Sequence, residues 1–256
     1  MAIDFLTIAV LGLIGLAIGF VGGLLGLVLG VLRFPLILST GVASTAMVAG
    51  TNIGVSTLGA TTAAFRHFRQ NNVHLRIFLI MALTGAAGAF IGSMLTKQVP
   101  STILFVIIGL IVSYEAYSLI ASSRKSGQST EGTKYNLGIE SGIGFGVGLL
   151  GGMVGLVLGS IRMPAMIGVL KMEPKIAIGT NLAASSIMGT AGLAGHVING
   201  NVDFLVLGVM GSTAMIGGYI GAKYTDRFSP RTLKQLIGMV LIIVAVLMFL
   251  KAAGLI

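Results

Sequence analysis

Apolar residues fill eight long stretches of the chain, with only short polar connectors between most of them. Crossing the ~30 Å hydrocarbon core of a bilayer takes about 20 predominantly apolar residues in a helix. Backbone groups in lipid must satisfy their own hydrogen bonds, so we expect these stretches to be transmembrane α-helices. The first one lacks a basic region before it, which favours a span over a cleaved signal. The stretches cover residues 5–21, 47–65, 77–96, 101–121, 137–154, 176–194, 204–222 and 236–250.

The chain repeats itself after about half its length. The segment GGLLGLVLGVLRFP at 22–35 returns as GGMVGLVLGSIRMP at 151–164, an offset of 129 residues (151 minus 22). The same offset aligns Thr51-Asn52 with Thr180-Asn181 without a gap. A period this long indicates two homologous halves rather than a solenoid. We assign residues 1–121 to a first transmembrane repeat, 122–136 to a polar cytoplasmic linker and 137–256 to a second transmembrane repeat.

Composition agrees with a membrane protein. Hydrophobic residues make up 55% of the chain and charged residues 9%, so there is too little polar surface to cover a soluble globule. The absence of cysteine excludes disulfides and thiolate metal sites. No metal-ligand cluster, nucleophile with a base, phosphate loop or nucleic-acid patch is present, so we expect no cofactor, no metal, no nucleic acid and no enzymatic activity. The net charge of +9 fits anchoring at the cytoplasmic face of a membrane.

Basic residues occupy different connectors in the two halves. The first half is basic at Arg66, Arg69 and Arg76, and the second is basic one connector later, from Lys223 to Lys234. Because short cytoplasmic loops retain Lys and Arg, this switch favours an inverted-topology repeat with an odd number of crossings per half. Five crossings require residues 5–21 and 24–41 to be two spans joined by a turn at Gly22-Gly23. The predicted fold is therefore an all-α polytopic membrane protein with eight to ten transmembrane helices, ten being favoured.

Two arginines lie in register inside apolar runs. Arg33 and Arg162 each stand two residues before a proline, which breaks the helical hydrogen-bond ladder. A lone arginine at membrane depth costs at least ~2.5 kcal/mol, so the pair indicates cationic ligands for an anion. The alternative is that each side chain snorkels to an interface or caps a helix end.

The second repeated polar feature is a Gly-Thr-Asn triplet at residues 50–52 and 179–181. A glycine before Thr-Asn offers a place for the helix to unwind, and amide and hydroxyl donors suit an oxyanion. We expect Asn52 and Asn181, with Thr51 and Thr180, to contact substrate. The alternative is that they join helices by hydrogen bonds. The aligned His67 and His196 are interpreted as incidental because they lie at the ends of spans.

The duplicated R-x-P segments, the paired Gly-Thr-Asn triplets and the chain length resemble the TauE/SafE sulfite-exporter family of inner-membrane transporters. The resemblance covers essentially the whole chain. It implies transport of sulfite, organosulfonates or related small organic anions, often outward. The resemblance leaves the substrate, direction, coupling ion and oligomeric state open.

These observations predict a secondary transporter of a small sulfur-containing oxyanion working by alternating access, with the lipid bilayer and the anion as partners. The predicted substrate-binding residues are Asn52, Asn181, Thr51, Thr180, Arg33 and Arg162. The alternatives are a passive anion channel, or a carrier of another small organic anion. Both a monomer and a homo-oligomer remain open.

Overall fold

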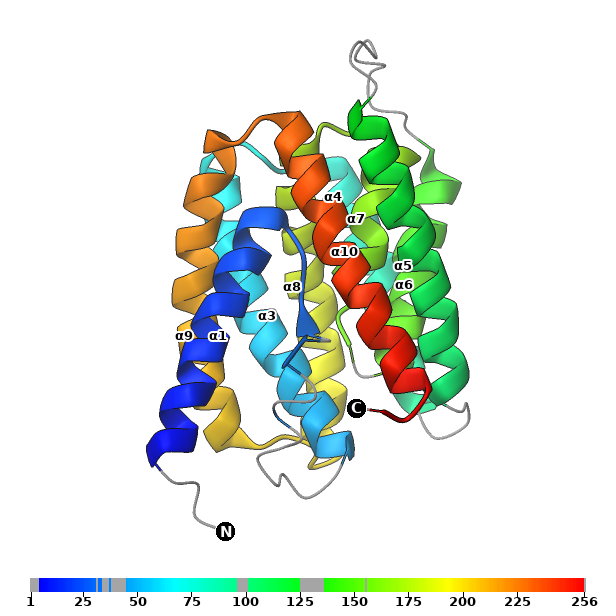
Figure 1. The fold of residues 1–256 in the computed structure, drawn as a ribbon. Coiled ribbons are helices and arrows are strands. Elements are labelled where there is room, and N and C mark those ends of the chain that lie inside the picture. Colours follow the sequence, from blue (N-terminus) through cyan, green and yellow to red (C-terminus); the bar gives the residue numbers. More distant parts are fainter. Residues whose placement is uncertain are drawn as a thin grey trace.

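The computed structural model describes residues 5–30, 32–33, 37, 45–95, 101–124, 136–154 and 156–255. Within these ranges all regular structure is helical, and the helices pack side by side in one bundle (Figure 1). This confirms the predicted all-α fold. The elements are α1 Phe5–Leu25, α3 Thr45–Arg69, α4 Leu75–Leu95, α5 Ser101–Arg124, α6 Leu137–Val154, α7 Gly159–Gly168, α8 Pro174–Ile198, α9 Phe204–Tyr224, the 3₁₀ turn η1 Thr225–Arg227, and α10 Pro230–Ala252.

Several helices are long and apolar enough to cross a membrane. Among the described residues five qualify, and they contain α1, most of α4, α8, α9 with η1, and α10. Large apolar side chains point outward along the bundle, including Phe5, Leu83 and Ile216. Exposed apolar surface on this scale needs a lipid or protein environment. The chain is therefore a multi-pass membrane protein.

The eight predicted apolar stretches coincide with the long helices. The predicted linker at 122–136 begins inside α5, which continues to Arg124, and α6 starts at Leu137. Residues 125–135 of that linker lie outside the described residues. The short α7 has 10 residues, which at 1.5 Å per residue extend about 15 Å, half the thickness of a bilayer core.

The first break of the first half falls later than predicted. We expected a turn at Gly22-Gly23, but α1 continues through both glycines to Leu25. The turn is at Gly26, whose φ is +70°, and Leu27–Leu29 are not helical. A Cβ on Gly26 would lie 2.7 Å from Ile178 Cα, so glycine is required there for space as well as for conformation.

The first helix of each half packs on a helix of the other half, α1 on α9 and α6 on α4. Along α1 and α9, Gly15 lies against Met210 and Gly23 against Gly218, so these helices run in the same direction. The equivalent helices α6 and α4 pack in the same way and also run in parallel, since Gly144 lies against Met81 and Gly152 against Ala89. Small residues at these seams let the backbones approach closely, as is common in membrane helix pairs.

Helices α3 and α8, which correspond at the offset of 129, cross in the middle of the bundle (Figure 1). They run in opposite directions, because Gly50 of α3 lies against His196 near the end of α8, and Gly179 near the start of α8 lies against His67. Helix α3 runs in the same direction as α9, since Thr62 donates to the carbonyl of Met215 and Gly59 lies beside Ala214. Helices α1 and α3 are therefore parallel, which places Leu25 and Thr45 at opposite ends of the bundle.

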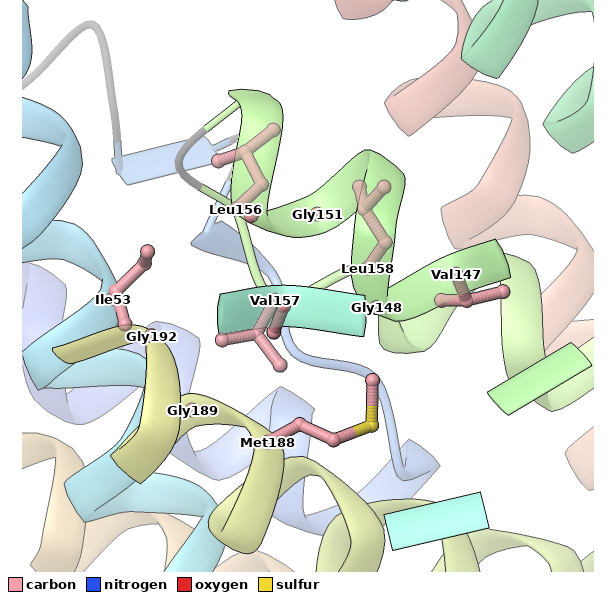
Figure 2. A pocket seen from close by; sticks show the side chains of 12 residues that line it. Ile53, Val147, Gly148, Gly151, Leu156, Val157, Leu158, Met188, Gly189 and Gly192 are labelled. Carbon is pink, nitrogen blue, oxygen red and sulfur yellow. The ribbon is translucent and has the colours of Figure 1, made fainter. Parts of the chain in front are cut away.

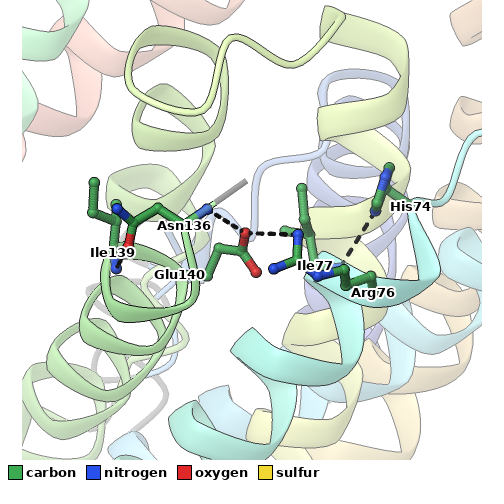
Figure 3. Close-up of polar contacts among 6 residues, drawn as sticks. All are labelled: His74, Arg76, Ile77, Asn136, Ile139 and Glu140. Atoms are coloured by element: carbon green, nitrogen blue, oxygen red, sulfur yellow. Dashed lines mark hydrogen bonds and ion pairs between the residues drawn. The ribbon is translucent and has the colours of Figure 1, made fainter. Parts of the chain in front are cut away.

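One end of the bundle collects ion pairs and basic connectors. Asn72, between α3 and α4, donates from Nδ2 to Asp226 Oδ1 in η1 at 3.0 Å. At the same end Arg76 Nη1 lies 3.3 Å from Oε1 of the buried Glu140, which also accepts from the backbone N–H of Asn136 (Figure 3). A buried carboxylate needs such partners, and these bonds tie the start of α4 to the start of α6.

Candidate functional site

Arg162 lies at the centre of a hydrogen-bonded cluster between α7 and α8. Its Nε donates to Asn181 Oδ1 at 2.7 Å, and its Nη2 donates to the Asn181 carbonyl at 3.0 Å and to Ser185 Oγ at 2.5 Å. Its Nη1 contacts the thioether sulfur of Met188, a weak acceptor. The side chain is fully buried. Four of the five guanidinium N–H groups therefore have a protein partner, and the arginine is held as part of the structure.

Asn181 extends this cluster to the other half of the chain. Its Nδ2 donates to the carbonyl of Gly26 at 2.7 Å and to that of Gly159 at 2.9 Å. Gly26 is the turn that ends α1, whereas Gly159 begins α7. The amide therefore ties the break of the first half to α7 and α8 of the second.

The equivalent residues in the first half make far fewer hydrogen bonds. Arg33 is 3% exposed, and its Nη2 donates to Ser56 Oγ at 2.6 Å. Among the residues that the structure describes, Arg33 Nε and both polar atoms of the Asn52 side chain have no partner. A buried polar group without a hydrogen bond costs about 1–3 kcal/mol, and such groups in a native protein call for an explanation such as a ligand or bound water.

Arg33 lines a cavity. The space has a volume of about 20 Å³, enough for a water molecule, and it lies between α1, the break after α1, and α3. Arg33, Ser56 and Leu182 line it, together with Ile18, Gly19, Gly22, Gly23, Leu27, Val28, Leu29, Gly59 and Ala60. The cavity therefore combines an incompletely bonded guanidinium, a hydroxyl and an otherwise apolar wall.

The second half has a matching cavity of the same size, bounded by Gly148, Gly151 and the break at Leu156–Leu158 (Figure 2). Ile53 lines it, as the equivalent Leu182 lines the first cavity, so each half contributes a side chain to the other half's cavity. The two cavities differ in one respect that matters chemically. Arg33 lines the first, whereas Arg162 does not line the second, and Met188 extends into it from α8 (Figure 2).

Thr51 and Thr180 point away from both arginines. Thr51 Oγ1 accepts from the backbone N–H of Asp203 at 2.9 Å, and Thr180 Oγ1 accepts from that of His74 at 2.9 Å. Asp203 and His74 are equivalent residues, in the connectors before α9 and α4, and each lies in the half opposite to the threonine that it contacts. The two threonines therefore hold connectors in place across the boundary between the halves.

The glycine of each triplet lies at the same contact between a helix and a connector. The prediction that the helix unwinds at this glycine is wrong. Helices α3 and α8 continue without interruption through Gly50 and Gly179. A Cβ on Gly50 would lie 1.9 Å from the carbonyl oxygen of Asn201, and one on Gly179 would lie 2.0 Å from that of Asn72. Glycine is needed there so that the connector backbone can approach the helix.

The structure thus separates the predicted site residues into three groups. Arg162 and Asn181 form a hydrogen-bonded cluster. Arg33 and Asn52 are the equivalent residues of the first half, and polar atoms of both lack partners among the described residues. The two threonines hold connectors. Ser56 and Ser185 bind the arginines directly, and both belong to hydroxyl pairs that the repeat makes visible in the sequence. The offset of 129 also aligns Gly59 with Met188, so the sequence itself contains this difference between the two halves.

His67 has a structural role that the sequence did not indicate. It is fully buried, and its Nε2 lies 3.1 Å from the carbonyl oxygen of Gly23 on α1. In the part of the chain that the structure describes, no group of three or more His, Asp and Glu side chains could hold a metal ion.

The bundle of apolar helices, with buried arginines near the contact between two repeats, defines a multi-pass helical membrane protein with a polar site in its interior. The chain belongs to the Sulfite exporter TauE/SafE family, which it matches over residues 11–248.

Its curated relatives are named as membrane transporters. It is 25% identical over 241 residues to the "Probable membrane transporter protein YdhB" of Bacillus subtilis (strain 168), covering 91% of this chain and 94% of that protein. It is 24% identical over 211 residues to "Probable membrane transporter protein YunE" of the same organism, covering 76% and 77%. A "Probable membrane transporter protein" of Xylella fastidiosa (strain 9a5c) is 26% identical over 241 residues, covering 92% and 90%. No solved structure matches the chain.

Proposed function

We propose that this protein is a secondary transporter of the inner membrane, not an enzyme, and that it exports a small sulfur-containing oxyanion such as sulfite or an organosulfonate. The observation that carries the proposal is Arg33, a buried cation that lines a cavity and makes one hydrogen bond, to Ser56, among the residues that the structure describes. An anion is the ligand that such a group selects. Family membership and the names of the relatives point the same way.

The chemistry of the cavity suits a tetrahedral or pyramidal oxyanion. A guanidinium presents its donors as a planar fork that can bond two oxygens of one ligand. Ser56 already lies against that fork and can contribute its hydroxyl to a bound anion. The aliphatic and glycine wall offers apolar surface against which a small substituent, such as that of an organosulfonate, would pack once the wall moves apart. We assign Arg33, Asn52 and Ser56 to the anion, and Arg162 and Asn181 to the scaffold that supports it.

Alternating access needs two bodies that move against each other, and the repeat supplies them. Two observations support halves in inverted topology with five crossings each. Helices α3 and α8 cross antiparallel, and each half packs its first helix on the other half, α1 on α9 and α6 on α4. The end that carries Arg69, Arg76 and Arg227 would face the cytoplasm, because short basic connectors are retained there. Thr51 and Thr180 fix connectors that lie on the boundary between the halves.

The cavity volume indicates that the described conformation is closed. A space of about 20 Å³ holds one water molecule but is too small for a sulfonate. Binding therefore requires the wall to move apart.

Flux through proteoliposomes tests the proposal. Protein reconstituted with internal sulfite should take up radiolabelled sulfite by exchange, and uptake should saturate with concentration. Arg33→Gln should abolish this uptake, and Lys175→Gln, at the partly exposed end of α8, is the matched control for loss of a positive charge. A passive channel would instead show current proportional to voltage in planar bilayers, without stimulation by internal substrate. Uptake by Arg33→Gln equal to that of wild type would overturn the proposal.

A further inference from the structure

The two arginine cavities are related by the repeat, but one position distinguishes them. Gly59 in α3 corresponds to Met188 in α8 at the offset of 129. Gly59 has no side chain and leaves the guanidinium of Arg33 open to its cavity. Met188 is 4% exposed, lines the second cavity and places its sulfur against Arg162 Nη1.

A second difference accompanies the first. A Cβ on Gly85 of α4 would lie 2.6 Å from both the sulfur and the terminal methyl of Met188. Gly85 corresponds to Ala214 of α9, whose Cβ is 3.5 Å from the position of a Cβ on Gly59. The second half thus combines a large residue with a glycine to receive it, and the first half combines a glycine with an alanine. The space beside each arginine is therefore set by a matched pair of residues.

Hydrogen bonding also distinguishes the two arginines. Arg162 and Asn181 bond each other and exhaust most of their donors and acceptors on protein groups. Arg33 Nε and Asn52 Oδ1, the equivalent pair, make no hydrogen bond to each other or to another described residue. Both are buried, so an added ligand or a water molecule is needed to satisfy them.

We infer that the repeat contains one anion site per chain, at Arg33, and that Met188 fills the equivalent place beside Arg162 as an internal plug. The inference rests on the proposed function, since it takes the ligand of Arg33 to be the transported anion. Its consequence is an asymmetric transporter in which the two symmetric halves have different roles. The first half binds, and the second half supplies a rigid, hydrogen-bonded counterpart.

Placing the matched pair of the second arginine cavity at the equivalent positions 59 and 214 of the first tests the inference of one anion site per chain. Binding of sulfite and of methanesulfonate is measured by calorimetry on purified protein in nanodiscs, and wild type should bind one anion per chain. Gly59→Met combined with Ala214→Gly transfers the plug to the first half and should weaken binding at least tenfold. Met188→Leu keeps a plug of similar volume and should bind as wild type does. Melting temperatures identify variants that fail to fold.

A rescue experiment tests the same point without filling the first cavity. Arg33→Gln should lose binding, and adding Met188→Gly should restore a weaker site that disappears again with Arg162→Gln. Wild-type binding that survives in the folded Gly59→Met/Ala214→Gly protein would overturn the inference and leave the proposed function intact. Failure of Met188→Gly to restore any binding would also overturn it. If wild type bound neither anion and transported neither, the proposed function would fail and the inference with it.

Discussion

Asn72 Nδ2 donates a 3.0 Å hydrogen bond to Asp226 Oδ1, although the two residues are 154 positions apart in the sequence. Lys175 adds a contact to the same residue, since its Nζ lies 3.2 Å from the Asp226 carbonyl oxygen. The contact brings the basic connector of the first half beside the basic connector of the second. The two basic connectors therefore lie at the same end of the bundle.

The first prediction concerns topology. The chain has no cysteine, so single introduced cysteines report accessibility without a background. Arg69→Cys and Arg227→Cys should both resist a membrane-impermeant maleimide added outside intact cells, because both positions face the cytoplasm in the proposed arrangement. Asn199→Cys, exposed in the connector at the opposite end, should label readily. Lys97→Cys, which lies outside the described residues, should label as well. Strong external labelling at position 69 or 227 would contradict the inverted arrangement.

The second prediction separates the two arginines. Arg33→Lys should reduce anion affinity at least tenfold, because an ammonium offers a point charge where the guanidinium offers a fork. It should leave the melting temperature nearly unchanged, since only one hydrogen bond to Ser56 is altered. Arg162→Lys should lower the melting temperature and leave anion affinity nearly unchanged. It removes bonds to Asn181 and Ser185 and leaves buried acceptors unpaired, at about 1–3 kcal/mol for each.

Ligand binding and thermal unfolding measured on the same purified samples decide between these outcomes. Equal effects of the two lysine variants on affinity would show that both arginines contact the anion, as the repeat in the sequence suggested. A snorkelling role for either residue would make its lysine variant neutral in both measurements.

The third prediction makes the same comparison for the two asparagines. Asn181→Ala removes two donated hydrogen bonds and one accepted bond, each contributing about 0.5–1.5 kcal/mol, or more where the charged guanidinium is the partner. We expect a clear loss of stability. Asn52→Ala removes no hydrogen bond between described residues, so the free energy of unfolding should hold or increase while affinity for the anion decreases.

The check is a pair of denaturation curves with matched binding isotherms. Loss of stability in Asn52→Ala comparable to that in Asn181→Ala would show that Asn52 joins helices, and would remove it from the anion site.

The sequence predicted much of this architecture for identifiable physical reasons. Apolar runs of about 20 residues locate the long helices, because a run of that length in lipid satisfies its own backbone hydrogen bonds as a helix, and the offset of 129 pairs the helices of the two halves. The in-register repetition of Arg162 and Asn181 at membrane depth marks them as buried polar residues, although not as hydrogen-bond partners of each other. These features depend on composition and spacing, which the sequence states directly.

The rest depends on where side chains point and what fills the space beside them. Thr51 and Asn52 are neighbours in sequence, but about 100° apart around a continuous helix, so one faces a connector and the other the interior. The prediction of an unwound helix at Gly50 placed both residues at the same site, whereas the continuous helix separates them. The difference between the two arginines depends on Met188 being received by Gly85 on another helix, a contact that no spacing in the chain encodes.

The last prediction concerns the boundary between the halves. Thr51→Val and Thr180→Val keep the shape of the side chain but remove the acceptor for the backbone N–H of Asp203 or His74. Each loss should cost about 0.5–1.5 kcal/mol and loosen a connector, without changing anion affinity, because neither hydroxyl lies at an arginine. The turnover rate of transport should change instead, since these bonds must persist or break as the halves move. Thr190→Val is the control, because its exposed hydroxyl bonds only within α8, to the Ser186 carbonyl. Proteoliposome flux and calorimetric affinity, measured for all three variants, separate the effects. A tenfold loss of affinity in either interface variant, with the control unaffected, would return these threonines to the anion site.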